Sequence, residues 1–232
     1  MPIHQALITS IRNPFNIQVL GTASSLTTTD LSATFDCSTV ATGDSVIFLY
    51  MGEDDGDAAT GQTFSLSVGG STANTLVSNS NTAGKARAGI FLTTSSSVVG
   101  NSSVSVSITS SNQNGGARGY IAALRVSSFT PGEDPTLRKT ESSSSNLLQN
   151  SFNNQNGGNL ILTVGYFSNG NNHTLSCDEA DLITGDGVTT SAGSGDFGFM
   201  TAPATAFAID YTRGGTANSQ GDVLISISIS PG

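Results

Sequence analysis

Few side chains in this chain could carry acid–base or nucleophilic chemistry. The 232 residues include two histidines, His4 and His173, and two cysteines, Cys37 and Cys177. His173 falls on an expected strand beside a loop, so it is the one candidate for a general base. Ser176 and Cys177 follow it closely, but adjacent positions of a strand point to opposite faces and do not form a triad unaided. We interpret His173 as an exposed strand or loop histidine and assign no catalytic residue.

The sequence also lacks the motifs that bind metals, phosphates or dinucleotides. The histidines and cysteines do not have the spacing of a metal site, and there is no Gly-x-Ser-x-Gly elbow. Gly185, Asp186 and Gly187 read as a turn, since no helix is expected after them. Cys37 and Cys177 lie far apart in dissimilar contexts, which predicts two free, partly buried thiols. We expect no cofactor and assign no cofactor-binding or metal residue.

Acidic residues are concentrated in one short segment, at Glu53, Asp54, Asp55 and Asp57. Such a loop offers oxygen ligands to a hard cation such as calcium, but it lacks the spacing and the distant Glu of an EF-hand. We favour a solvated acidic turn, and interpret the weaker cluster at residues 178–181 in the same way. A pair of carboxylates for glycoside hydrolysis needs only spatial proximity, so a hydrolase stays open as a third reading.

Aromatic residues do not indicate a sugar-stacking platform. The chain has no Trp, and its four tyrosines fall mostly within strand patterns, which predicts core or sheet-face positions for Tyr50, Tyr120, Tyr166 and Tyr211. Asn-rich segments at residues 153–156 and 169–172 could hydrogen-bond a glycan or form ordinary turns.

Charge excludes some partners. With 8 basic and 17 acidic residues, the chain has a net charge of -9, and it lacks the clustered cations that phosphate backbones require. No nucleic-acid partner is therefore expected. The sequence has neither a secretory signal pattern nor a stretch of 18 apolar residues, so no membrane partner is expected either. We expect the protein to stay in the producing cell or to leave within a larger assembly.

Hydrophobic patterning predicts strands rather than helices. Alternating or short apolar runs occur at residues 45–51, 63–68, 88–92, 104–108 and 120–126, each bounded by Gly, Asn, Asp or Ser. Residues 104–108 alternate strictly, which predicts apolar side chains inside and serines outside. The chain should be all-β and antiparallel.

The order of these segments recurs in the second half of the chain. Gly43 and Asp44 before the run at 46–49 correspond to Gly158 and Asn159 before the run at 160–164. Further counterparts are 64–66 with 173–176, 89–91 with 196–200, and 120–126 with 223–229. We predict an all-β fold of two tandem antiparallel, jelly-roll-like β-sandwich domains at 21–130 and 146–232, with an N-terminal arm at 1–20 and a linker at 131–145. One larger sandwich, and a plain first strand in place of the arm, are the alternatives.

The first half resembles the small β-sandwich modules of tailed-bacteriophage structural proteins. The resemblance rests on four segments, which are residues 42–50 with Gly43-Asp44 before an apolar run, residues 86–92 with Ala88-Gly89-Ile90-Phe91, the Ser/Thr/Val-rich residues 103–109, and residues 117–127, which end in Ala122-Ala123-Leu124-Arg125-Val126-Ser127. It implies a non-enzymatic virion protein, on the outer surface of the particle, that decorates or cements the head shell. Its partners would be the major capsid protein or other virion proteins. The resemblance also implies a homo-oligomer, for example a trimer.

The small number of lysines agrees with a role in an assembly. Lysines usually protect the exposed edges of sheets in free monomers, and this chain has few of them. The alternative function is a receptor-binding or carbohydrate-binding module of a tail or capsid fibre, with the Asn-rich and acidic loop tips on a host glycan. The acidic net charge agrees with a position away from the packaged genome.

Overall fold

The computed structural model describes residues 15–25, 31–54, 64–80, 86–94, 96–110, 117–127, 129, 136–142, 145–153, 158–168, 173–177, 182–184, 188–189, 193–214 and 221–230. These residues form strands joined by turns and bends, so the all-β prediction is confirmed. In this part of the chain, no helix is long and apolar enough to cross a membrane.

The first half contains two antiparallel sheets. The first large sheet has the order β1-β9-β3-β7-β6, and the first small sheet has the order β2-β8-β4-β5. Their strands are β1 (Asn16–Ser25), β2 (Ser32–Phe35), β3 (Ser45–Asp54), β4 (Phe64–Val68), β5 (Ser71–Thr72), β6 (Asn74–Ser80), β7 (Ala86–Thr93), β8 (Val104–Ser110) and β9 (Ala117–Ser127).

The second half again contains two antiparallel sheets. The second large sheet has the order β10-β18-β12-β16-β14, with β15 also paired to β16, and the second small sheet has the order β11-β17-β13. Their strands are β10 (Thr136–Ser142), β11 (Leu147–Phe152), β12 (Leu160–Ser168), β13 (His173–Cys177), β14 (Ile183–Thr184), β15 (Val188–Thr189), β16 (Gly193–Thr201), β17 (Phe207–Arg213) and β18 (Asp222–Ile229).

Both halves share one strand order. In each large sheet the first strand pairs with the last, and the last pairs with a central strand, β3 or β12. The central strands begin after equivalent turns, because Gly43 and Gly158 both have positive φ, at 91° and 96°. Asp44 contacts Arg125 through an ion pair of 2.6 Å, and at the equivalent positions Asn159 donates a hydrogen bond of 3.1 Å to Ser228. The sequence repeat therefore marks equivalent turns and equivalent strand pairs.

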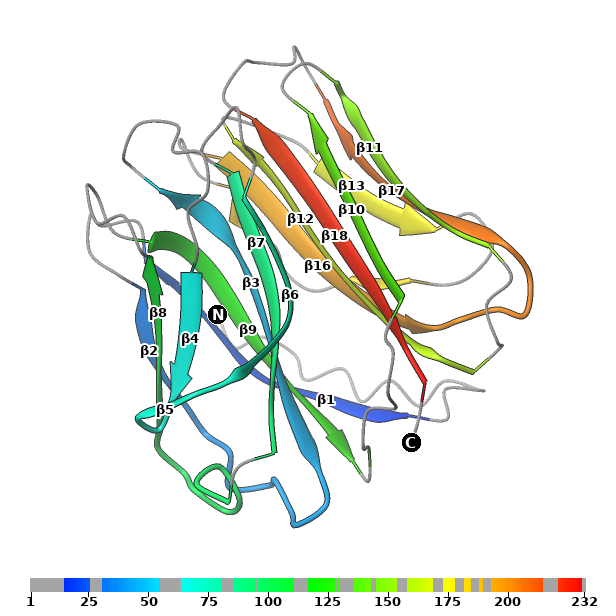
Figure 1. Cartoon of the computed structure of the whole chain (residues 1–232). Coiled ribbons are helices and arrows are strands. Elements are labelled where there is room, and N and C mark those ends of the chain that lie inside the picture. Colours follow the sequence, from blue (N-terminus) through cyan, green and yellow to red (C-terminus); the bar gives the residue numbers. More distant parts are fainter. Residues whose placement is uncertain are drawn as a thin grey trace.

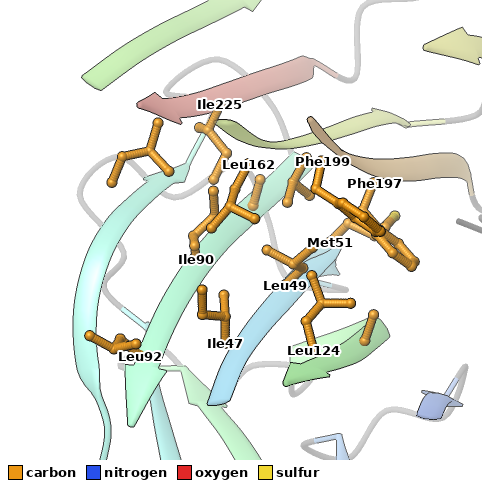
Figure 2. Packing of buried hydrophobic residues seen from close by; sticks show 14 of the residues in the cluster. Ile47, Leu49, Met51, Ile90, Leu92, Leu124, Leu162, Phe197, Phe199 and Ile225 are labelled. Atoms are coloured by element: carbon orange, nitrogen blue, oxygen red, sulfur yellow. The ribbon is translucent and has the colours of Figure 1, made fainter. Parts of the chain in front are cut away.

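The four sheets stack as layers, with the two large sheets in the middle (Figure 1). The first core cluster of 23 residues joins the two large sheets, with Ile47, Leu49 and Ile90 on one side and Leu162, Phe199 and Ile225 on the other (Figure 2). A second cluster lies between the sheets of the first half and includes Phe48, Phe91 and Val106. A third lies between the sheets of the second half and includes Phe152, Phe167 and Tyr211. Both faces of each large sheet are thus buried.

The interior of the second half is partly polar. Asn150 of β11 is 3% exposed and donates hydrogen bonds to Ser226 Oγ at 2.9 Å and to the Leu224 carbonyl at 3.3 Å. Its Oδ1 accepts a hydrogen bond from Thr140, while Thr163 and Ser226 share another at 2.8 Å. This network satisfies the small polar side chains that replace apolar ones between these two sheets.

Two segments differ from the expected boundaries. Residues 16–20, expected in the arm, form the first part of β1, which pairs with β9 along its length. A bulge between Val19 and Gly21 lets Ile17 pack against the first cluster and Leu20 against the second. Residues 136–142, expected in the linker, form β10, whose Leu137 and Lys139 lie opposite Ile227 and Ile225 of β18. Residues 1–14 lie outside the described part of the chain.

Candidate functional site

His173 is half-buried and not exposed as expected, because its side chain lies on the inner face of the second small sheet. It is the first residue of β13 and the register partner of Arg213 in β17. The two side chains therefore share the face that is turned toward the second large sheet. The imidazole contacts the Tyr211 ring edge-on, with 5.6 Å between the ring centroids.

The other candidate nucleophiles do not join His173. Ser176 occupies an alternate position of β13 and faces away from it, whereas Cys177 is partly buried against the third cluster. Cys37 is fully buried in the second cluster, in the other half of the chain. Both cysteines are free, as predicted, but Cys37 is completely rather than partly buried. Burial raises the pKa of the Cys37 thiol, and neighbouring Asp36 adds to this effect.

The four tyrosines are core residues, as predicted. Tyr50 and Tyr211 are completely buried, while Tyr120 and Tyr166 are 6% and 4% exposed. None of these rings is available as a shelf for a sugar. The acidic clusters fall outside the described residues, except that Glu53 and Asp54 end β3. The Asn-rich segments also fall outside, apart from the exposed Asn153.

A buried group of polar side chains closes one end of the second half, and the sequence analysis missed it. Asp222, Phe167 and Ser194 are register neighbours on β18, β12 and β16, so they form one row on the inner face of the second large sheet. Arg213 and His173 form the opposing row on the second small sheet. We call Asp222, Ser194, Arg213 and His173 the inner polar group. The strict alternation of β17, with Phe207, Ile209, Tyr211 and Arg213 inward, was the signal that could have placed Arg213 inside.

An ion pair and an aromatic stack organise this group. Arg213 Nη2 lies 3.3 Å from Asp222 Oδ2, and the two side chains are 1% and 0% exposed. The guanidinium also lies 4.8 Å from the centroid of the Phe167 ring, which stacks on Tyr211 at 4.4 Å. Tyr211 donates a hydrogen bond of 3.2 Å to the Ser194 carbonyl. Burial raises the pKa of Tyr211 well above its usual value, with the charge of Asp196 as the next cause.

Some atoms of the inner polar group are buried without a hydrogen-bond partner. They include His173 Nδ1, Ser194 Oγ and Arg213 Nε. Burial lowers the pKa of His173, because charging the ring there costs desolvation free energy. Among the described residues, no three His, Cys, Asp or Glu side chains gather as metal ligands. The charges of Arg213 and Asp222 compensate each other, and the atoms without a hydrogen-bond partner are buried from solvent. The group therefore does not form an open binding site.

The first small sheet presents a different kind of surface. We call its outer side the hydroxyl face, defined by Ser32, Thr34, Ser65, Ser67, Thr72, Ser105, Ser107 and Thr109. Ser107 is the register partner of Ser32 and Ser67, and Ser67 is the partner of Thr72, so these hydroxyls form a row across four strands. The predicted outward position of the serines in β8 is confirmed, because Ser105 is exposed and Ser107 half-buried. Ser65 and Thr109 hydrogen-bond across the strands at 3.1 Å.

The equivalent outer side of the second small sheet is not uniform. It carries Leu147, which is 45% exposed, and Gln149, which donates a hydrogen bond of 2.7 Å to Asp210.

No family model, no curated protein and no solved structure matches this chain. The resemblance to bacteriophage β-sandwich modules therefore stays a prediction that rests on the four quoted segments.

The structure gives those segments a physical role. Gly43 provides the left-handed turn before β3, and the Asp44 carboxylate accepts hydrogen bonds from Ala41 N at 2.8 Å and from Arg125 Nε at 2.6 Å. Arg125 belongs to the segment that ends the first half. One part-buried ion pair thus joins the first and the last of the four segments. This contact indicates a role in the fold rather than in a binding site.

Proposed function

We propose that the protein is a non-enzymatic virion structural protein that decorates or cements the outer surface of a capsid. The hydroxyl face is the observation that carries this proposal. Eight short neutral side chains cover four adjacent strands, and none of these positions carries a charge. Burying such a surface against another protein desolvates no ion and immobilises little side-chain entropy.

The layered core supports a role in stabilising the capsid mechanically rather than a catalytic role. Both faces of each large sheet are buried, and the first cluster spans the two halves. A packed stack of sheets deforms little, because close-packed interiors have low compressibility. We propose that each half is a jelly-roll-like sandwich, so that the chain is a tandem pair. The shared strand order, with the first strand beside the last and the last beside the third, is the support for this assignment.

The partners follow from this proposal. The hydroxyl face would contact the major capsid protein or a second copy of the chain, and a trimer is the proposed homo-oligomer. The net charge of -9 suits an outer position, since it disfavours contact with packaged nucleic acid. Residues 1–14 are the part of the proposed arm that lies outside the described residues. A deletion that tests the arm should stop at residue 14, because Phe15 is buried against Phe129.

The copy number of the chain per purified virion tests the proposal directly. Quantitative mass spectrometry against the major shell protein should find hundreds of copies if the protein decorates the head. A handful of copies would support the fibre module instead, and glycan binding would then be measured. Absence of the chain from the particles would overturn the virion proposal.

A pair of matched variants tests the hydroxyl face. Ser107→Arg places a charge at its centre, whereas Thr212→Arg places one on the outer side of the second small sheet, where Thr212 pairs with Leu147 and Thr174. We expect Ser107→Arg to abolish incorporation into particles and Thr212→Arg to leave it unchanged, with both proteins folded by circular dichroism. Normal incorporation of Ser107→Arg would remove the hydroxyl face from the proposal.

A further inference from the structure

β13 is a short edge strand beside the inner polar group. Within the described chain it is an edge strand that pairs only with β17, over five residues. Short edge strands belong to the parts of a fold that open most easily. Three side chains anchor it from inside, and one of them is Cys177, which packs against the third cluster. Leu175 is 5% exposed and packs in the third cluster, and His173 places its ring against Tyr211.

The surroundings of His173 suit only the neutral ring. Its Nδ1 is buried without a hydrogen-bond partner, and its register partner is the Arg213 cation. From β16, Ser194 and Asp196 face the same interior, and from β18 Asp222 does so. Asp222 is committed to Arg213 at 3.3 Å, and desolvation is the cause of the lowered pKa of His173, without a compensating contribution from either carboxylate.

We propose that β13 is an acid-sensitive strand, and that adding a proton to His173 opens it away from β17 and β16 while the rest of the fold stays closed. An imidazolium has two N–H donors that need acceptors. The closed state provides none at Nδ1 and places a second cation nearby. In the open state the ring reaches water, which satisfies both donors.

Linkage gives the direction of the effect. His173 has a lower pKa in the closed state than in the open state. The preference for the closed state is therefore complete when the pH is above the ordinary histidine pKa of about 6.5. This preference is lost as the pH falls from there toward the closed-state pKa. Each unit between the two pKa values corresponds to about a tenfold change in the opening equilibrium. The inference goes beyond the proposed function and does not depend on it.

Amide hydrogen exchange of β13 in the full chain tests the proposal. We would compare wild type, His173→Phe and His4→Gln at about pH 7.5 and about pH 5, spanning the histidine range, after correction for intrinsic exchange rates. The His4→Gln variant is the matched control, because His4 is the other histidine of the sequence. Amides of β8, in the first half, report on global unfolding.

The expected result is a several-fold rise in β13 opening at the lower pH for wild type and His4→Gln, no rise for His173→Phe, and no change in β8 for any of them. Should His173→Phe fail to fold, His173→Gln replaces it, since that side chain is neutral at both pH values. A pH-independent β13 in wild type would overturn the proposal. An unchanged rise in the His173 variant, or an NMR titration of the His173 ring at or above its ordinary pKa, would do the same.

Discussion

At the scale of single residues, the second half depends on a charge pair that water does not reach. Arg213 and Asp222 are 1% and 0% exposed, and they lie 3.3 Å apart beside the Phe167–Tyr211 stack. A buried pair of this kind contributes little net stability compared with apolar residues, but losing one partner leaves an uncompensated charge. The pair therefore limits which substitutions are tolerated at Arg213 and Asp222.

Replacing Asp222 should be much more damaging than replacing an exposed acid. We expect Asp222→Ala to lower the free energy of unfolding by about 3–5 kcal/mol, because Arg213 stays buried without its partner. Asp210→Ala, which removes the contact with Gln149 on the outer side of the second small sheet, should cost about 0–1 kcal/mol. Urea denaturation measures both. Equal midpoints for the two variants would show that the buried pair is not critical.

At the scale of elements, glycines let strands approach the large aromatic side chains. A Cβ at Gly165 of β12 would overlap the Tyr211 ring, with Cε1 only 2.6 Å away. A Cβ at Gly193 of β16 would collide with the hydroxyl of Tyr166. Because both rings are buried, neither can swing out into solvent to make room. These glycines are thus required by packing and not by backbone conformation.

Gly165→Ala should destabilise the protein, whereas Gly21→Ala should not. The extra methyl group at position 165 forces Tyr211 or the backbone to move, which typically costs about 1–3 kcal/mol. At Gly21 a Cβ would meet Phe35 at 3.4 Å, an ordinary contact. Thermal unfolding followed by circular dichroism compares the two variants with wild type. An unchanged midpoint for Gly165→Ala would contradict the tight fit around Tyr211.

At the scale of the whole molecule, the two halves are joined by an apolar interface as well as by the chain. The first core cluster takes Ile47, Leu49 and Ile90 from one large sheet and Leu162 and Ile225 from the other. It is the largest of the three clusters, and its members are buried (Figure 2). Burial of this extent favours association without any covalent link.

Cutting the connection between the halves should therefore leave them together. A protease site inserted within residues 131–135 allows the chain to be cut between the halves, and we expect the two fragments to elute as one species in size-exclusion chromatography. In the same background, Leu162→Lys buries a charge in the interface and should separate the fragments. Separation of the cleaved fragments without that substitution would show that the chain, and not the cluster, holds the halves together.

Much of the local structure followed from the sequence. Short apolar runs located strands such as β3 and β18, period-two alternation located β8, and Gly43 and Gly158 marked equivalent turns. The burial of the tyrosines and the free state of both cysteines were also predicted. The strands β10, β11 and β17 were not recognised, because polar residues at their exposed positions resemble loop composition. Their alternation becomes meaningful only once the opposing sheet is known.

What the tertiary structure alone decided is the environment of each face. Ser105 and Ser107 in β8 and Ser226 and Ser228 in β18 alternate with apolar residues in the same way, so the sequence pattern is equivalent. In β8 the serines face outward, whereas in β18 they are 0% and 2% exposed. The difference arises because β18 belongs to a sheet buried on both faces, where Asn150 and Asn159 provide the hydrogen bonds that a buried hydroxyl requires. Alternation determines that a strand has two faces, and only the stacking of the sheets determines which face meets water.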